Sequence, residues 1–317
     1  MSAGHPLPRD AAAVPRPPAW KQRQFQSIGR RPYLRRRAEE LAALRFERIG
    51  LRPLAATVGA EVEGVDLREP LDGETFAEIR RAFLAWRVLF FRDQPISAEQ
   101  HVAFARRFGE LEGHPVLPTR DAGGALVIFA KDAETTGYEN LWHADVTFRE
   151  CPALGAMLRA VEVPALGGDT LFADMVAAYE GLAPETKRRI DGLRAIHDFG
   201  TSFGLGLPAE ERERKRRELP PVSHPVVRTH PETGERALFV NPIFTDHVEG
   251  VSAAESDALL EQLFREAQVP EYQCRFRWTV DAIALWDNRA VQHYAVNDYW
   301  PARRVMERAT IAGDRPV

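Results

Sequence analysis

Residues 141–148 constrain most strongly what this chain can fold into. Aromatic and β-branched residues alternate with others along this stretch, a pattern that predicts a β-strand. Side chains two positions apart leave a strand on the same face, so His143 and Asp145 would point toward one place. An imidazole and a carboxylate are two of the three ligands of the 2-His-1-carboxylate face, which binds Fe(II) and leaves coordination positions open for reagents. Such a site needs a second histidine.

The best second histidine is His293, one of nine in the chain. It follows an apolar strand and precedes an arginine-rich one, so the chain could return it to the first pair. We expect His5, His101 and His230 to be solvated or incidental, because they lie in a Pro-rich segment, a charged helix and a turn. Without such a partner, a His-x-Asp pair is more often a hydrogen-bonded surface or core pair than a metal site.

Arginines recur at strand spacing in residues 303–311. A period of two puts Arg304, Met306 and Arg308 on one face, with the two arginines roughly 13 Å apart along the backbone. A planar guanidinium suits a carboxylate or a sulfonate. Two of them near a metal suggest an anionic co-substrate and an anionic substrate, and the alternative is a solvated arginine face.

Taken together, these motifs resemble the Fe(II)/2-oxoglutarate-dependent dioxygenases of the TauD/TfdA family, over roughly residues 46–315. The segments that carry the resemblance are residues 142–148, 167–171, 238–241, 286–289, 292–294, 303–304 and 308–310. The resemblance implies a mainly β fold with flanking helices, the distorted double-stranded β-helix or jelly roll, which many short strands with helices outside them also suit. It also implies Fe(II), 2-oxoglutarate and O2, with ascorbate supporting activity in vitro and succinate and CO2 as products.

Residue by residue, the resemblance assigns the reaction centre. It implies that His143, Asp145 and His293 bind the iron and form the catalytic centre. It further implies that Arg304 binds the distal carboxylate of 2-oxoglutarate with help from the Thr170 hydroxyl. From its own sequence context, Thr170 would be an ordinary strand threonine.

The same resemblance assigns a substrate pocket. Arg308, His114 and the backbone N–H of Val146 match the groups that hold a sulfonate in taurine dioxygenase. Phe203 and Phe244 match aromatic walls of its pocket. A small anionic organic molecule is therefore the expected substrate.

Two positions depart from the taurine dioxygenase pattern. Leu117 replaces a tyrosine and Glu139 replaces an asparagine, and in taurine dioxygenase these two groups handle the substrate amine. Their loss argues against taurine, although Glu139 could receive another cationic group or face water, and we expect it to face water. The far end of the pocket becomes partly apolar.

The expected reaction is hydroxylation of an alkyl sulfonate or a sulfate ester next to the sulfur-bearing group. The product would fall apart to an aldehyde and an inorganic sulfur anion. Alternatives are the same chemistry on a carboxylate, such as an aryloxyalkanoate or a natural-product intermediate, or a non-catalytic metal-binding jelly roll. A structural zinc site usually has four protein ligands. We see no fourth ligand beside this triad.

Composition excludes several other classes. The net charge of -4 and a pI near 6.2 argue against nucleic-acid binding. The two cysteines, Cys151 and Cys274, cannot form a disulfide framework, and we expect both to be buried in a protein of the reducing cytoplasm. No apolar run reaches the roughly 18 residues of a membrane span. We expect no membrane association, and a homo-oligomer, dimer or tetramer.

The domain organisation is predicted as a leader followed by one catalytic domain. Residues 1–45 are a Pro/Arg-rich leader that we expect to be poorly ordered, and residues 46–317 are the catalytic domain with a helical insert around 176–220. Residues 132–139 are a candidate lid. Helices are expected after the caps Asp72, Ser97 and Ser252, and strands at residues 46–49, 60–67, 88–91, 125–129, 154–158, 170–174, 226–228, 237–240, 272–278 and 282–286.

Overall fold

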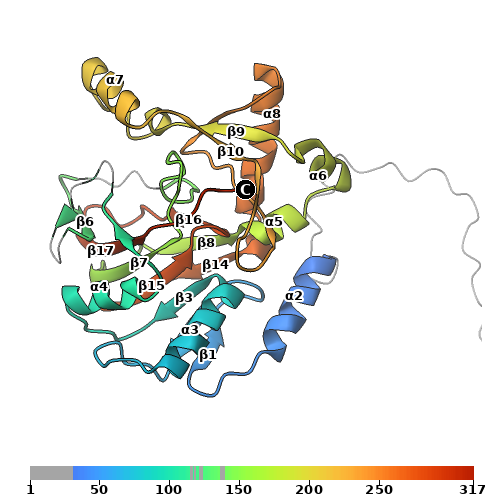
Figure 1. The fold of residues 1–317 in the computed structure, drawn as a ribbon. Coiled ribbons are helices and arrows are strands. Elements are labelled where there is room, and N and C mark those ends of the chain that lie inside the picture. Colours follow the sequence, from blue (N-terminus) through green and yellow to red (C-terminus); the bar gives the residue numbers. More distant parts are fainter. Residues whose placement is uncertain (1–30, 115–116, 118, 121–123, 136–139) are drawn as a thin grey trace, which may run out of the picture.

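The structure is a computed structural model that describes residues 31–114, 117, 119–120, 124–135 and 140–317 (Figure 1). Its strands are β1 (Gly50–Pro53), β2 (Ala60–Glu63), β3 (Val88–Phe91), β4 (Leu111–Glu112), β5 (Thr119–Arg120), β6 (Leu126–Lys131), β7 (Gly155–Glu162), β8 (Thr170–Asp174), β9 (Arg194–His197), β10 (Val222–Pro225), β11 (Val227–Thr229), β12 (Arg236–Leu238), β13 (Thr245–Val248), β14 (Gln273–Phe276), β15 (Ile283–Asp287), β16 (Val291–Ala295) and β17 (Arg304–Ile311). Its helices are α2 (Pro32–Ala43), α3 (Gly73–Trp86), α4 (Ala98–Arg106), α5 (Met175–Glu180), α6 (Pro184–Ile190), α7 (Ala209–Glu218) and α8 (Ala253–Phe264), with short 3-10 turns η2 (Phe199–Thr201), η3 (Arg265–Gln268) and η4 (Pro270–Tyr272).

Two facing sheets build the body of the molecule. In the larger sheet the strand order is β1-β2-β3-β15-β7-β17-β6-β5, with β4 also paired to β17, and in the smaller one it is β14-β8-β16. The pairs are antiparallel except β2 with β3. Aromatic rings join the sheets, since Phe90 of β3 stacks on Phe276 of β14 with centroids 4.1 Å apart. This mainly β jelly roll with flanking helices confirms the predicted fold class.

Helices α3 and α4 cover the larger sheet, and the local sequence explains where they begin. The Asp72 carboxylate accepts a hydrogen bond from the Thr75 N–H at 2.7 Å, and Ser97 forms a reciprocal capping box with Gln100. These two predicted caps are therefore confirmed, as is the third, Ser252, which accepts a hydrogen bond from the Glu255 N–H at the start of α8. Apolar residues of α3 and α4 pack on the outer face of the larger sheet and form one buried core with it.

The predicted leader and insert are only partly described. Leader residues 32–43 form α2, whose Leu34 and Leu41 are buried, and residues 1–30 lie outside the described part of the chain, so the leader remains a prediction. Region 176–220 contains most of α5, then α6, β9, η2 and α7, and α7 buries no side chain, as its ionic sequence predicts. Nowhere in the described residues is there a helix long and apolar enough to cross a membrane.

Several local predictions are wrong. Residues 46–49 are not a strand, because β1 begins only at Gly50. Cys151 is exposed, whereas Cys274 is buried as expected. His101 and His230 are both buried rather than solvated, at 0% and 2% exposure. His101 packs under the larger sheet, within 3.2 Å of the Met157 carbonyl oxygen, and His230 lies 2.9 Å from the Asp287 carboxylate.

Candidate active site

The segment that carries His143 and Asp145 is not the predicted strand. Only His143 pairs, in an isolated antiparallel bridge with His293, and a turn follows at residues 145–148. Val146 has a φ of 47°, a left-handed conformation that costs a β-branched residue on the order of 1–3 kcal/mol and that ends any strand. The prediction failed because valine normally favours a strand, and tertiary contacts override that preference here.

Asn288 fixes this turn from the neighbouring chain. Its side-chain oxygen accepts the Asp145 N–H at 2.6 Å, and its amide donates to the backbone oxygens of Asp145 and Ala153 at 3.0 and 3.1 Å. Thr147, the residue after Val146, is held in the same way by Asn241, whose amide donates to its hydroxyl at 3.0 Å. The motifs at residues 238–241 and 286–289 thus support the turn.

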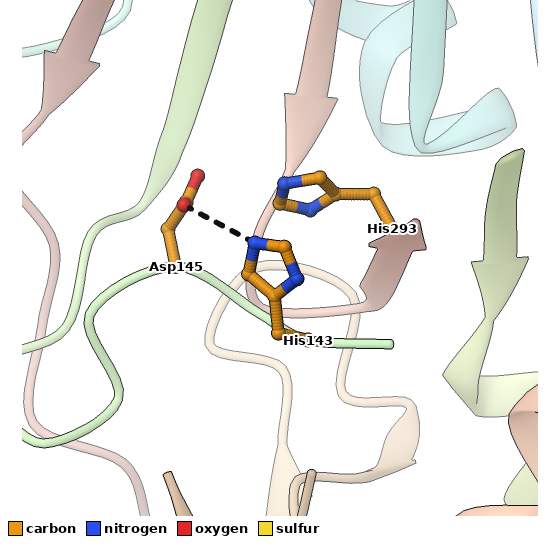
Figure 2. Close-up of side chains that lie close together, drawn as sticks. All are labelled: His143, Asp145 and His293. Atoms are coloured by element: carbon orange, nitrogen blue, oxygen red, sulfur yellow. Dashed lines mark ion pairs between the residues drawn. The ribbon is translucent and has the colours of Figure 1, made fainter. Parts of the chain in front are cut away.

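The structure brings His143, Asp145 and His293 together. One ligand atom from each lies within 4.8 Å of the others, and His143 Nε2 is 4.0 Å from Asp145 Oδ1. Figure 2 shows the three side chains facing one another, with His293 entering from β16. The backbones of the two histidines exchange two hydrogen bonds, at 3.0 and 2.8 Å. The bridge thereby holds the segment of His143 beside β16, although the two histidines are 150 residues apart in sequence.

The donor set fits a divalent metal ion. Asp145 Oδ2 is buried and has no hydrogen-bond partner within the described residues, a rare condition that a bound cation would relieve. His143 Nδ1 lies 2.8 Å from the Leu141 carbonyl oxygen, so it carries the ring proton and leaves Nε2 as a metal-binding lone pair. Two nitrogens and one carboxylate on one side are the ligands of non-haem Fe(II).

The electrostatics keep these groups in their metal-binding forms. Burial and the neighbouring His143 lower the pKa of His293 to about 3, so its imidazole is neutral near pH 7. Burial alone would raise the pKa of Asp145, but the Arg308 guanidinium and the neighbouring histidines together outweigh burial, and the pKa falls to about 2. Arg308 Nη1 donates to Asp145 Oδ1 at 2.9 Å. An anion bound to Arg308 would therefore lie directly beside the metal position.

Two hollows meet at this cluster, with His143, Phe129 and Arg308 lining both. The first, which we call the co-substrate hollow, contains both residues predicted to bind 2-oxoglutarate, Thr170 and Arg304. They come from β8 and β17. Arg304, Met306 and Arg308 all line this hollow, so the predicted strand face is confirmed.

The second hollow, which we call the substrate hollow, has a volume of about 240 Å³. It gathers the described members of the predicted substrate set, His114, Leu117, Val146, Phe203, Phe244 and Arg308. The remaining member, Glu139, lies outside the described residues, as do four of the eight positions of the candidate lid 132–139. The Leu117 N–H donates to His114 Nδ1 at 2.9 Å, which puts the proton of the neutral ring on Nε2, a donor suited to an anion.

Sequence reasoning missed several lining residues. Phe129 lines both hollows, and its ring centroid lies 4.8 Å from the Arg308 guanidinium carbon, but the sequence shows it only as part of an apolar strand. Phe129 lies two residues after Val127 on β6, so the two side chains leave the strand on the same face. The sequence did not show that this face borders the site. Two further lining residues of the substrate hollow, Thr201 at the end of η2 and Ile243 in a turn, carry no periodic signal.

A metal-ligand cluster that opens on one side toward an arginine-lined hollow, inside a jelly roll, defines a 2-oxo-acid-dependent oxygenase. Comparisons with known proteins agree. The model of the family described as "Taurine catabolism dioxygenase TauD, TfdA family" matches residues 50–310. This chain belongs to the TauD/TfdA family.

Three relatives illustrate the range of the family. The chain is 38% identical over 277 residues to an alpha-ketoglutarate-dependent sulfate ester dioxygenase of Pseudomonas putida, covering 85% of this chain and 91% of that protein. It is 39% identical over 283 residues to the alpha-ketoglutarate-dependent 2,4-dichlorophenoxyacetate dioxygenase of Cupriavidus pinatubonensis, covering 84% and 98%. The crystal structure of a taurine dioxygenase from Burkholderia xenovorans matches with a TM-score of 0.74 and 40% identity, covering 86% of this chain and 91% of that one.

The chain is therefore a 2-oxoglutarate-dependent dioxygenase that uses Fe(II) and O2. This excludes the alternative of a non-catalytic metal-binding jelly roll. Its relatives act on small organic molecules.

Proposed function

We propose that this dioxygenase hydroxylates a small organic anion with an apolar tail, an alkyl sulfate ester or alkyl sulfonate. His143, Asp145 and His293 hold Fe(II), and Arg304 with Thr170 holds the distal carboxylate of 2-oxoglutarate. The observation that carries the proposal is the hydrogen bond from Arg308 to Asp145 at 2.9 Å, which ties an anion-binding group to a metal ligand.

Bound iron, with 2-oxoglutarate and O2, supplies the oxidation that replaces a C–H bond by C–OH, with succinate and CO2 as co-products. The protein's residues decide which carbon reacts. Arg308, the His114 ring N–H and the Val146 backbone N–H hold the anionic group next to the metal position. The carbon bonded to that group is therefore the one presented to the oxidant.

Hydroxylation at that carbon explains how the sulfur group leaves. A sulfate ester R–CH2–O–SO3⁻ becomes R–CH(OH)–O–SO3⁻, whose C–O bond to sulfate breaks as the hydroxyl loses its proton. The products are the aldehyde R–CHO and hydrogen sulfate. A sulfonate follows the same course, breaks its C–S bond and releases hydrogen sulfite.

The rest of the substrate hollow favours an apolar tail. Phe203 and Phe244 lie with centroids 6.0 Å apart at 26°, and Leu117 and Ile243 add aliphatic surface. Apart from Asp145, no carboxylate lines this hollow within the described residues, so no described group replaces those that handle the taurine amine. We expect turnover of taurine to be poor.

An aryloxyalkanoate is the second candidate. The pair of phenylalanine rings could enclose an aryl group, and a guanidinium binds carboxylate as readily as sulfate. The relative from Cupriavidus pinatubonensis is named for such a substrate. In this case hydroxylation next to the ether oxygen would release a phenol and a 2-oxo acid.

A panel of matched anions tests the proposal. Succinate formation and O2 uptake are measured with Fe(II), ascorbate and 2-oxoglutarate, using hexyl sulfate, hexanesulfonate, phenoxyacetate and taurine. We expect kcat/KM for hexyl sulfate or hexanesulfonate to exceed that for taurine at least about tenfold, the effect of burying a short alkyl tail. Higher kcat/KM for phenoxyacetate than for both sulfur compounds would favour the second candidate, and equal turnover of taurine would contradict the apolar-tail assignment.

We also propose a cytoplasmic setting and a homo-oligomer. Both cysteines are free thiols, which suits a reducing compartment. Light scattering on the purified protein measures the oligomeric state directly, and a monomeric mass would contradict the second part.

A further inference from the structure

Trp278, which belongs to none of the motifs above, contacts the co-substrate hollow through Thr170. Its indole Nε1–H donates a hydrogen bond to Thr170 Oγ1 at 2.9 Å. Both side chains are buried, Thr170 at 3% exposure and Trp278 at 6%. Trp278 lies two residues beyond the end of β14, and β14 is paired with β8, the strand that begins at Thr170. The contact is therefore part of the sheet framework.

This hydrogen bond has only one possible direction. An indole N–H donates and cannot accept, so the Thr170 oxygen must be the acceptor. The hydrogen of the Thr170 hydroxyl is then available for a different acceptor, and within the described residues Thr170 donates to none. Because Thr170 lines the co-substrate hollow, that acceptor can be a ligand group in the hollow.

The same region fixes the side chain of Arg304. Its guanidinium carbon lies 6.0 Å from the ring centroid of Trp278 and 5.8 Å from that of Tyr299. On another side it meets Gly168, where an added Cβ would stand 3.2 Å from Arg304 Cδ and Nε. Gly168 has a φ of 72°, and its N–H donates to Asp298 Oδ1 at 2.8 Å. Gly168 of the motif at residues 167–171 thus leaves room for the Arg304 side chain.

We propose that Trp278 is a positioning residue that makes the Thr170 hydroxyl an obligatory donor and so selects a 2-oxo acid with a distal carboxylate. A carboxylate has only acceptors, so it matches a hydroxyl donor beside a guanidinium, whereas a neutral hydrocarbon end does not. The inference rests on the proposed placement of 2-oxoglutarate against Thr170 and Arg304. It adds a residue that touches neither the metal ligands nor the substrate hollow.

The test variant is Trp278→Phe, which keeps a ring and removes the N–H. Binding of 2-oxoglutarate is measured by titration calorimetry under argon with the Fe(II)-loaded enzyme, and 2-oxovalerate, which has a methyl group in place of the distal carboxylate, is the comparison ligand. We expect the Kd for 2-oxoglutarate to rise about tenfold, as for loss of one hydrogen bond to a charged group, and the Kd for 2-oxovalerate to change less than about twofold. The kcat at saturating 2-oxoglutarate should stay within about twofold, because the reacting groups are untouched.

Trp300→Phe is the matched control. Trp300 is 62% exposed, donates its indole N–H to the Ala133 carbonyl oxygen and lines neither hollow, so the Kd for 2-oxoglutarate should not change. A second arm combines Trp278→Phe with Thr170→Val. If Trp278 acts through the Thr170 hydroxyl, adding Trp278→Phe to Thr170→Val should raise the Kd for 2-oxoglutarate by less than about twofold.

The outcomes separate this inference from the proposed function. Unchanged 2-oxoglutarate affinity in Trp278→Phe, or full additivity with Thr170→Val, overturns the inference, provided that Arg304→Ala weakens 2-oxoglutarate binding. If Arg304→Ala does not weaken it, the proposed placement of the co-substrate is itself wrong. Should Trp278→Phe fail to fold, Thr170→Ser and Thr170→Val decide: equal 2-oxoglutarate affinity in these two variants overturns a donor role for the hydroxyl.

Discussion

The two hollows that meet at His143 are built from different kinds of structure. The co-substrate hollow takes most of its wall from strands, including β6, β7, β8, β16 and β17. The substrate hollow takes most of its wall from turns and loops, at His114, Val146 and Phe244 among others. Sheet positions are fixed by paired backbones, whereas loops tolerate change. This difference agrees with relatives that depend on the same co-substrate but are named for a sulfate ester in one case and a chlorinated phenoxyacetate in another.

The largest effect is expected where the two hollows join. Asp145→Ala removes a carboxylate that we assign to the metal and that also pairs with Arg308, so turnover should fall about a thousandfold or more and bound iron should be lost. Succinate formation and metal analysis of the protein measure both. Chelation of the wild-type enzyme should abolish activity, and added Fe(II) should restore it. Full iron content in Asp145→Ala would contradict the ligand assignment.

A second pair of variants separates the hollows. Arg304→Ala should raise the KM for 2-oxoglutarate about a hundredfold with less effect on the substrate, because it removes a charge-assisted pair. Arg308→Ala should mainly raise the KM of the organic anion. The opposite pattern would reverse the two assignments.

Arg303→Ala is the control for this pair. Arg303 is the neighbour of Arg304, and its partner is Glu162 on the surface, with the Arg303 side chain 55% exposed. Both KM values should stay within about twofold, since exposed ion pairs contribute little.

A smaller effect should be confined to the loop-built hollow. Phe203→Ala removes half of the aromatic pair, so kcat/KM for hexyl sulfate should fall about tenfold through lost apolar contact. The KM for 2-oxoglutarate should be unchanged, and Phe203→Leu should recover most of the loss. Equal losses for hexyl sulfate and for methyl sulfate, which has no tail, would show that Phe203 does not contact the tail.

The smallest effect expected is on the pH dependence of the free energy of unfolding, through one buried histidine packed against each of the two regions. Burial lowers the pKa of both His101 and His224 to about 4. His101 contacts the Met157 carbonyl oxygen of β7, on the strand-built side. His224 lies 2.9 Å from the carbonyl oxygen of Arg149, just after the metal-site turn. Both rings are charged in the unfolded chain below about pH 6.5 but stay neutral in the folded protein until about pH 4. The unfolded state therefore binds more protons in this window, and stability should fall as pH decreases, by up to about 1.4 kcal/mol per pH unit for each histidine.

Urea titrations at pH 7.5, 6 and 5 measure this dependence. His101→Gln and His224→Gln should each reduce the slope of unfolding free energy against pH. A slope unchanged in both variants would show that neither histidine carries it.

The sequence predicted the strand-built side better than the loop-built side, for a physical reason. The alternation of Arg304, Met306 and Arg308 is a period of two, and pairing with β6 and β7 preserves it in the structure. The turn at Val146 has no such signature, since a left-handed valine is stabilised only by distant contacts such as those of Asn288. Pattern alone therefore predicted a strand there.

The sequence also predicted poorly which isolated polar residues are buried and what they contact. His101 lies four residues before Ala105 and seven before Phe108, the spacing of a buried helical face, and that spacing could have revealed its burial. Trp278 gave no such hint, because an alternating strand pattern predicts its burial but not the partner of its N–H. The acceptor that a buried donor contacts depends on which strands pair, and the order of residues in the sequence does not show that pairing.

The backbone bridge between His143 and His293 has a consequence for how the enzyme acquires iron. The backbones of two of the three proposed ligands, His143 and His293, are joined by main-chain hydrogen bonds that require no ion. Capture of the metal then demands little further ordering of the chain, unlike zinc fingers, which fold only around their ion. We therefore expect the protein without bound iron to keep its fold and to bind iron again without refolding.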